Sequence, residues 1–265
     1  MTAEALIRCK DLRRYFVMGN ETVHALDGVG VSVDQGEFLA LFGPSGSGKS
    51  TFLYLLGGLD RPSEGRIWVN GQEITGIDED ALAEYRRHEV GFIFQSFHLL
   101  PMMTAVQNVE LPMVFAGVPI EQRRTRAQEL LELVGLGDRM KHKPTELSGG
   151  QQQRVAIARA LANDPKIILA DEPTGNLDTR TGEEIMALLS TLNREQGKTI
   201  LIVSHDPSVT NYTSRCLHLR DGTLEATEAG GASWHGPARD SSPQLAGGRT
   251  SFPERDGAFQ PSGVA

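Results

Sequence analysis

Hydrophobic residues along this chain form short, strand-sized runs that alternate with stretches of helical period. The apolar run at residues 38–42 is followed by a helical pattern at 48–56, and the run at 167–171 by one at 180–195. Strand-helix alternation with short links favours a parallel sheet covered by helices on both faces, so the pattern predicts an α/β fold. The other expected strands lie at residues 5–16, 29–33, 66–71, 90–94 and 199–203, with a small strand pair around Asp221, and the other expected helices at 78–88 and 150–162.

Two regions depart from this alternation. Residues 5–33 are rich in β-forming residues and contain a turn around Gly19, which predicts an N-terminal antiparallel β subdomain. Residues 104–135 carry two helical patterns with little β signal, separated by Gly-Val-Pro at 117–119. We therefore expect a helical subdomain at about residues 96–160, inserted between strands of the core.

The composition changes after residue 227. The remaining residues are mainly glycine, serine, proline and alanine with scattered charges, and they show no hydrophobic period. Such segments bury too little apolar surface to offset the entropy lost on ordering. We therefore expect residues 1–227 to form the folded domain and residues 228–265 to be a disordered tail.

Composition and charge narrow the class of protein. The 265 residues suffice for one large domain, or for a domain with a small subdomain. A formal net charge of −8 provides no general basic field, so we expect no nucleic-acid partner. Cys9 and Cys216 have neither metal-binding nor disulfide spacing, which is consistent with a reducing cytosol. We expect no membrane span, so a function at a membrane needs a partner that supplies one.

A glycine-rich turn follows the expected strand at 38–42. Residues 43–50 match the phosphate-loop pattern in its usual place between a strand and a helix, which predicts a P-loop NTPase core. Backbone amides of such a loop bind the α- and β-phosphates, its lysine bridges the β- and γ-phosphates, and its last hydroxyl is a Mg²⁺ ligand. The candidate nucleotide-binding residues are Gly43, Pro44, Ser45, Gly46, Ser47, Gly48, Lys49, Ser50 and Thr51.

Two adjacent carboxylates end the expected strand at 167–171. A hydrophobic strand that delivers a carboxylate to its carboxyl end, beside a phosphate loop, is the expected position of the magnesium-organising group. We assign Asp171 to the Mg²⁺ shell through a water molecule. Glu172 is then the candidate general base that polarises the attacking water.

A second glycine-serine turn, Leu-Ser-Gly-Gly-Gln at 147–151, opens the expected helix at 150–162. The exposed amides and the dipole at a helix N-terminus favour an anion. Because the chain already has a phosphate loop, a second anion site needs another explanation. One explanation is that this turn serves the nucleotide held by a second copy of the protein.

In this order, the motifs at 43–50, 147–151 and 171–172 resemble those of the ATP-binding subunit of ABC transporters, and the resemblance covers about residues 5–226. It implies that Gln95 reaches Mg²⁺ and the attacking water, and that His205 contacts the γ-phosphate. The catalytic set is thus Glu172, His205 and Gln95, and the metal set is Ser50, Gln95 and Asp171. The residues implied to act in trans, on ATP held by the other subunit, are Ser148, Gly149, Gly150, Gln151 and Asp178.

The family stacks adenine on an aromatic side chain near the N-terminus. Tyr15 and Phe16 are adjacent here, and strand alternation places them on opposite faces. Spacing to the phosphate loop favours Phe16, and stacking needs only the face of a ring. Core packing is the alternative for whichever of the two faces inward.

Within the family, the segments at 108–112, 142–144, 148–161 and 173–178 resemble one subgroup. It includes ATPases for lipoprotein release, macrolide efflux and antimicrobial-peptide resistance, and the related cell-division ATPase. This implies a homodimer that closes around two Mg-ATP and drives a separate integral membrane permease for export or extraction, from the cytoplasmic side of the membrane. The alternative is a non-transport ABC ATPase that regulates a cell-envelope or cell-division complex. The cargo is not encoded in these motifs.

The family docks a short cytoplasmic helix of the membrane subunit on the segment at 95–117. An apolar cluster in this segment suits a helix-in-groove contact. Core packing within the helical subdomain explains the same cluster equally well. Its members are Phe97, Leu99, Leu100, Met102 and Met103.

Overall fold

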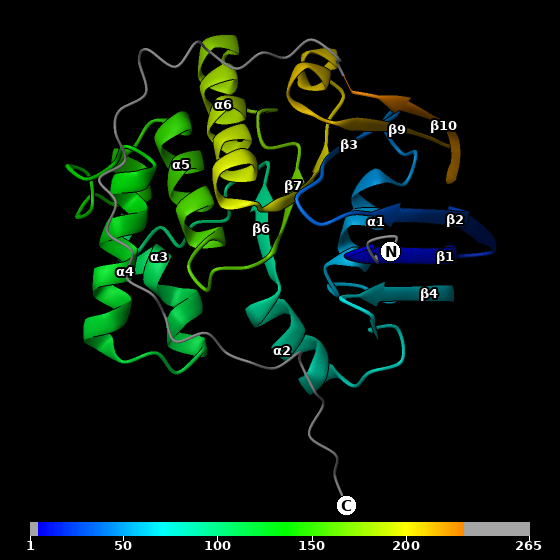
Figure 1. Ribbon diagram of the computed structural model, residues 1–265, viewed down its shortest axis with the longest axis horizontal. Coiled ribbons are helices and arrows are strands. Elements are labelled where there is room, and N and C mark those ends of the chain that lie inside the picture. Colours follow the sequence, from blue (N-terminus) through cyan, green and yellow to red (C-terminus); the bar gives the residue numbers. More distant parts are fainter. Residues whose placement is uncertain (1–4, 231–265) are drawn as a thin grey trace, which may run out of the picture.

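A computed structural model describes residues 5–230, which form two β-sheets and a group of helices (Figure 1). The strands are β1 (Ile7–Met18), β2 (Glu21–Val33), β3 (Phe38–Phe42), β4 (Glu64–Val69), β5 (Gln72–Glu73), β6 (Val90–Phe94), β7 (Ile167–Asp171), β8 (Thr199–Val203), β9 (Arg215–Arg220) and β10 (Thr223–Ala229). The helices are α1 (Lys49–Leu56), α2 (Glu79–His88), α3 (Ala105–Phe115), α4 (Ile120–Leu133), α5 (Gly149–Ala160) and α6 (Thr179–Gln196), with 3₁₀ turns η1 (Pro144–Glu146) and η2 (Pro207–Tyr212).

The central sheet has six strands in the order β10-β9-β3-β8-β7-β6. Strands β9, β3, β8, β7 and β6 are parallel to one another, and β10 pairs antiparallel with β9. Every residue of β3, β7 and β8 is buried, as expected for parallel strands covered on both faces. The predicted α/β fold with a mostly parallel sheet is confirmed.

The two faces of the central sheet belong to two separate cores. On β7, Ile168 and Ala170 pack in a core with α3, α4, α5 and α6. Ile167 and Leu169, on the opposite face of the same strand, pack in a core with α1, α2 and the N-terminal sheet. Helices α1 and α5 therefore cover opposite faces of one sheet, with α3–α6 grouped on one side in Figure 1.

The N-terminal sheet has the strand order β2-β1-β4-β5, with antiparallel pairing throughout. The predicted antiparallel subdomain is thus confirmed, but β2 begins at Glu21, well before the strand expected at 29–33. Residues 21–24 are exposed and pair with the end of β1, so their polar and apolar side chains show no inward-facing alternation. This part of the hairpin is stabilised by backbone pairing, which the hydrophobic pattern does not report.

The C-terminal boundary lies later than expected. Strand β10 runs to Ala229, past the predicted limit at residue 227, and the amide of Gly230 donates to the carbonyl of Ser214. Most of the predicted disordered tail, residues 231–265, lies outside the described residues. Among residues 5–230, no helix is both long and apolar enough to cross a membrane.

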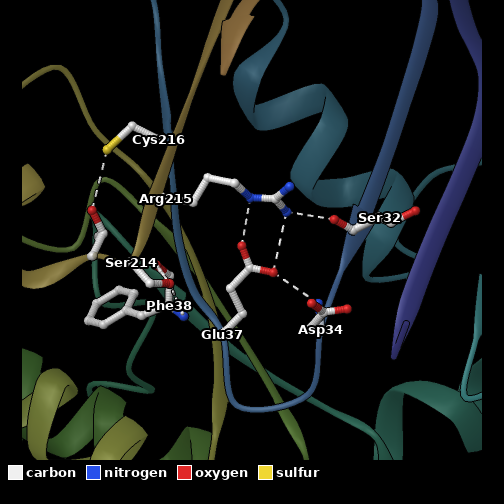
Figure 2. A network of polar contacts seen from close by, with 8 residues as sticks. Ser32, Asp34, Glu37, Phe38, Ser214, Arg215 and Cys216 are labelled. Carbon is white, nitrogen blue, oxygen red and sulfur yellow. Dashed lines mark hydrogen bonds and ion pairs between the residues drawn. The ribbon is translucent and has the colours of Figure 1, made fainter. Parts of the chain in front are cut away.

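An ion pair joins the beginnings of β3 and β9 (Figure 2). The guanidinium of Arg215 contacts both carboxylate oxygens of Glu37, at 2.7 and 3.3 Å, and also donates to the carbonyl of Ser32. Glu37 accepts a further hydrogen bond from the amide of Asp34. These contacts fix the amino ends of the strands and leave their carboxyl ends free for the loops that form the site.

Candidate active site

The predicted site residues lie on loops at one edge of the central sheet. The phosphate loop follows β3, Gln95 follows β6, Asp171 ends β7 and His205 follows β8. Because these four strands are parallel, their carboxyl ends meet at the same edge, where ligands bind in open α/β sheets. The topology thus brings together segments that are far apart in the sequence.

The phosphate loop is shaped by a close approach of the N-terminal sheet. Gly48 has a φ of 100°, and a Cβ there would lie 2.1 Å from the carbonyl oxygen of Ala25 on β2. Only glycine fits both the left-handed backbone and this contact. No side chain caps the N-terminus of α1, so its first amides are free to bind an anion. Ser47 Oγ is buried with no hydrogen-bond partner among the described residues, and a phosphate oxygen would satisfy it.

Lys49 is mostly buried and points back into the loop. Its Nζ donates to the carbonyls of Gly43, at 2.9 Å, and Pro44, at 2.8 Å. These contacts hold the ammonium group within the loop whose amides are expected to bind phosphate. The arrangement suits a cation that exchanges carbonyl partners for phosphate oxygens.

The carboxylate of Asp171 receives two hydrogen bonds from α1. Ser50 Oγ donates to Oδ1 at 2.9 Å, and the Tyr54 hydroxyl donates to Oδ2 at 2.8 Å. Partial burial and the contact with Asp171 raise the pKa of Tyr54 to about 12, so its hydroxyl stays protonated at neutral pH. Tyr54 is not among the site residues predicted from the sequence. Its spacing of one helical turn from Ser50 was the available signal, since residues at i and i+4 share a helix face.

The donors at this point fit magnesium. Ser50 and Asp171 present oxygen atoms, which a hard cation prefers, and Mg²⁺ commonly takes one or two protein ligands together with phosphate oxygens and water. No cluster of three or more His, Cys, Asp or Glu side chains that could hold a metal occurs in the described part of the chain. Magnesium bound by Ser50 and Asp171 would take its remaining ligands from phosphate oxygens and water.

Glu172 and His205 lie together, as the sequence predicts for catalytic residues. Glu172 Oε2 is 3.3 Å from His205 Nδ1, and Glu172 is the more buried side chain. The backbone of Glu172 is left-handed, with a φ of 46°, and its amide donates to the carbonyl of Val203 on β8. This bond directs the turn after β7 toward the loop that carries the histidine. Strained backbone of this kind is frequent at functional sites.

Gln95 reaches the same place from β6. An ideal Cβ on Gly175 would lie 2.7 Å from Gln95 Nε2 and 3.3 Å from Glu172 Oε2, so both side chains approach this glycine. Gln95 and Asn176 also exchange hydrogen bonds: Gln95 Nε2 donates to the Asn176 side chain, and Asn176 Nδ2 donates to the Gln95 carbonyl. These contacts tie the loop after β6 to the loop after β7.

The second glycine-serine turn caps α5. Ser148 Oγ accepts from the amide of Gln151, and Gln151 Oε1 accepts from the amide of Ser148, which is a reciprocal capping box. The amides of Gly149 and Gly150 remain at the open end of the helix. A Cβ on Gly150 would lie 2.3 Å from Thr181 Cγ2 on α6, so glycine also permits close helix packing there. Gln151 thus has a capping role that its sequence assignment omits.

Asp178 caps the neighbouring helix, α6. Its carboxylate accepts from the amide of Thr181 at 3.1 Å and from the Thr181 hydroxyl at 2.6 Å. These hydrogen bonds lower the pKa of Asp178. The local role is complete within one chain, and the expected role across a dimer remains a prediction.

The adenine candidates differ in their surroundings. The guanidinium carbon of Arg14 lies 4.5 Å from the centre of the Phe16 ring, and residue Phe16 is 37% exposed. Tyr15 packs against His24, with 4.5 Å between ring centres. Neither aromatic ring is buried in the core, so the core-packing alternative applies to neither. Phe16 keeps an exposed ring, and its contact with adenine remains a prediction.

The fold and the phosphate loop define a P-loop NTPase, and comparison with known proteins narrows the class. The ABC transporter family profile matches residues 26–175. An uncharacterized ABC transporter ATP-binding protein of Thermotoga maritima is 53% identical over 221 residues, covering 83% of this chain and 94% of that protein. The macrolide export ATP-binding/permease protein MacB of Shigella flexneri is 52% identical over 219 residues, covering 83% of this chain but only 34% of MacB.

Solved structures agree with these matches. The ATP-binding cassette MJ0796, solved as a dimer in a post-hydrolysis state bound to ADP and Pi, superposes with a TM-score of 0.79 at 47% identity. The match covers 84% of this chain and 98% of that one. The uncharacterized ABC transporter ATP-binding protein MJ0796 of Methanocaldococcus jannaschii is 49% identical over 227 residues, covering 84% of this chain and 97% of that protein. The chain belongs to the ABC transporter family and is an ATPase subunit of that family.

Proposed function

We propose that this chain dimerises around two Mg-ATP and uses their hydrolysis to drive a separate integral membrane permease, in an export or extraction system. The observation that carries the proposal is an incomplete site. The phosphate loop, Asp171, Glu172 and His205 share one sheet edge, whereas α5, with its exposed anion-ready end, packs on the face opposite α1. A second copy would supply the missing contact.

The phosphate loop would hold ATP. The free amides at the start of α1 would bind the α- and β-phosphates, and Lys49 would exchange the carbonyls of Gly43 and Pro44 for β- and γ-phosphate oxygens. Bound magnesium would neutralise charge on the phosphates, held by Ser50 and, through water, by Asp171, with Gln95 nearby. Phe16 would stack on adenine.

Glu172 would be the general base. Glu172 directly follows β7, at the same edge of the sheet as the phosphate loop, and its carboxylate would accept a proton from the attacking water. His205, 3.3 Å from that carboxylate, would orient it and donate to the γ-phosphate. Gln95 approaches the same point and would position the water.

The second subunit would close the site. The amides of Gly149 and Gly150 and the hydroxyl of Ser148 would face the γ-phosphate held by the partner, because the capping box leaves them at the open helix end. Gln151 would support them as the cap partner, and Asp178 would contact the other subunit. The related cassette was solved as a dimer bound to ADP and Pi, which supports a nucleotide-bound dimer of this chain. ATP would then shift the equilibrium toward the closed dimer.

A groove between α2, β6, α3 and α5 is the proposed docking surface for the permease. It has a volume of about 610 Å³ and an apolar lining that includes Phe92, Phe94 and Phe115, with Arg86 and Arg159 among its charged residues. This lining suits a short helix with an apolar face and an acidic residue. Such docking would place the chain at the cytoplasmic face of the membrane.

The apolar cluster after Gln95 was considered for docking of a membrane-subunit helix and for core packing, and its side chains differ in burial. Leu99 packs against the core beneath the helical subdomain. Met102 is 80% exposed and Leu100 is 43% exposed, so these two side chains are available to a partner. Leu99 therefore has the core-packing role, whereas Leu100 and Met102 are exposed but do not line the proposed docking groove.

Replacing Phe115 by aspartate is expected to abolish retention of the permease without changing the ATPase activity of the isolated chain. Phe115 lines the groove and is 69% exposed, and loss of such an aromatic contact typically weakens an interface by roughly 30-fold or more. The measurement is co-purification of the membrane subunit from native membranes. Ile120→Asp is the matched control, because Ile120 is an exposed apolar residue of the same subdomain that does not line the groove. Equal retention by both variants would contradict the docking site.

Deleting residues 231–265 is expected to leave ATP hydrolysis unchanged, since every proposed site residue lies before this segment. The cut preserves β10 and the hydrogen bond from Gly230 to Ser214. The measurement is the rate of phosphate release by full-length and shortened chains. A cut after residue 227 is the contrasting control, because it removes the end of β10. A large loss of activity after the 231–265 deletion would overturn the prediction that the tail is dispensable.

A further inference from the structure

We propose that Tyr54 is a positioning residue for ATP binding and hydrolysis, which fixes the Asp171 carboxylate in the orientation that the magnesium-nucleotide complex requires. The inference rests on the proposed magnesium site. It adds a residue that lies outside the phosphate-loop motif and that no motif of the sequence analysis contains. The evidence is the contact between the Tyr54 hydroxyl and Asp171 Oδ2 at 2.8 Å.

Both side-chain hydrogen bonds to the Asp171 carboxylate come from helix α1. Ser50 and Tyr54 lie one turn apart on α1, and each donates to a different oxygen of the carboxylate. One hydrogen bond leaves a carboxylate free to rotate about its Cβ–Cγ bond, whereas donors to both oxygens fix its plane. The Tyr54 contact therefore keeps Oδ1 facing Ser50, the proposed metal ligand.

Both partners of this contact sit on rigid elements. Asp171 is the last residue of β7 and pairs in register with Val203 on β8 and Phe94 on β6. The Tyr54 ring is half-buried against the core beneath the N-terminal sheet. The backbone carbonyl of Tyr54 also accepts a hydrogen bond from the amide of Leu59 at 2.9 Å, which fixes the end of α1. The backbone is therefore fixed at both Tyr54 and Asp171, which keeps the hydroxyl within hydrogen-bond distance of the carboxylate.

Removing the hydroxyl would leave Asp171 Oδ2 without this donor. Asp171 is only 9% exposed, so water replaces the lost hydrogen bond poorly. The carboxylate would then divide its time between orientations, and fewer of them would suit the metal. Removing the hydroxyl should therefore weaken nucleotide binding in the presence of Mg²⁺. Nucleotide binding without Mg²⁺, which depends on the phosphate loop alone, should be unchanged.

The test compares the binding of a fluorescent, non-hydrolysable ATP analogue with Mg²⁺ and with EDTA. For the full chain, Mg²⁺ is expected to tighten binding. In Tyr54→Phe that tightening is expected to shrink by roughly tenfold, the effect of one hydrogen bond to a charged group, while the affinity in EDTA stays within about twofold. A thermal unfolding midpoint confirms that the variant is folded.

Tyr85→Phe is the matched control. The Tyr85 hydroxyl also contacts α1, donating to the carbonyl of Leu56 at 2.7 Å, but it does not touch Asp171. That variant should lose stability and keep the full Mg²⁺ effect. Equal Mg²⁺ tightening in the unmodified chain and in Tyr54→Phe would overturn the role of Tyr54 alone. No tightening in the unmodified chain would instead overturn the proposed magnesium site.

Discussion

Glu172→Gln is expected to lower the rate of ATP hydrolysis by roughly 10²–10⁴-fold, the usual contribution of a general base. The amide keeps the shape of the side chain but cannot accept a proton from water. ATP affinity should be retained, because the phosphate loop and the Ser50–Asp171 contact are untouched. The measurement is phosphate release at saturating Mg-ATP, together with a nucleotide-binding titration.

Glu183→Gln is the control for that substitution. Glu183 is an exposed residue of α6, and it belongs to none of the loops at the site. Its variant should hydrolyse ATP at the normal rate. If Glu172→Gln retained more than about a tenth of the normal rate, Glu172 would not be the general base.

Mixing Lys49→Ala chains with Ser148→Arg chains is expected to restore hydrolysis that neither variant has alone. In a mixed dimer, one site combines an intact Lys49 from one subunit with an intact Ser148 from the other. That site should bind ATP with near-normal affinity, and the second site should be inactive. The physical reason is that Lys49 begins α1 on one face of the sheet, whereas Ser148 caps α5 on the other face.

The Ser148→Arg variant also loses a helix cap, which costs about 1 kcal/mol. Thr145→Arg is the control, because it adds the same charge near the turn without removing a helix cap. Thr145 is an exposed residue of η1 just before the turn and does not cap α5. Its homodimers should remain active. Native mass spectrometry shows whether mixed dimers form. If they form and the mixture is no more active than the separate variants, the cross-subunit site is contradicted.

Much of the fold could be predicted because the central strands are apolar on both faces. The expected strands at 38–42, 90–94, 167–171 and 199–203 have the observed bounds. The start of β2 was missed because residues 21–24 are exposed and are held by backbone pairing. Hydrophobic pattern reports burial, so it detects a strand in the core better than an exposed hairpin.

The site was predictable where a motif is contiguous and less so where two elements meet. The phosphate-loop pattern names Lys49 and Ser50 directly, and the loops that carry Glu172 and His205 meet as expected. The spacing of Tyr54 from Ser50 places both on one face of α1, but it does not specify that this face packs beside Asp171, so the role of Tyr54 was missed. The capping box at Ser148 could have been identified from sequence, since a serine followed three residues later by glutamine is its usual pattern.

In the proposed dimer, two chains enclose two ATP molecules in sites that neither chain completes alone. Light scattering of purified Glu172→Gln with and without saturating Mg-ATP tests it most directly, because the variant binds ATP but cannot use it. The expected mass is that of one chain without nucleotide and of two chains with Mg-ATP. A mass of one chain at saturating Mg-ATP would contradict it.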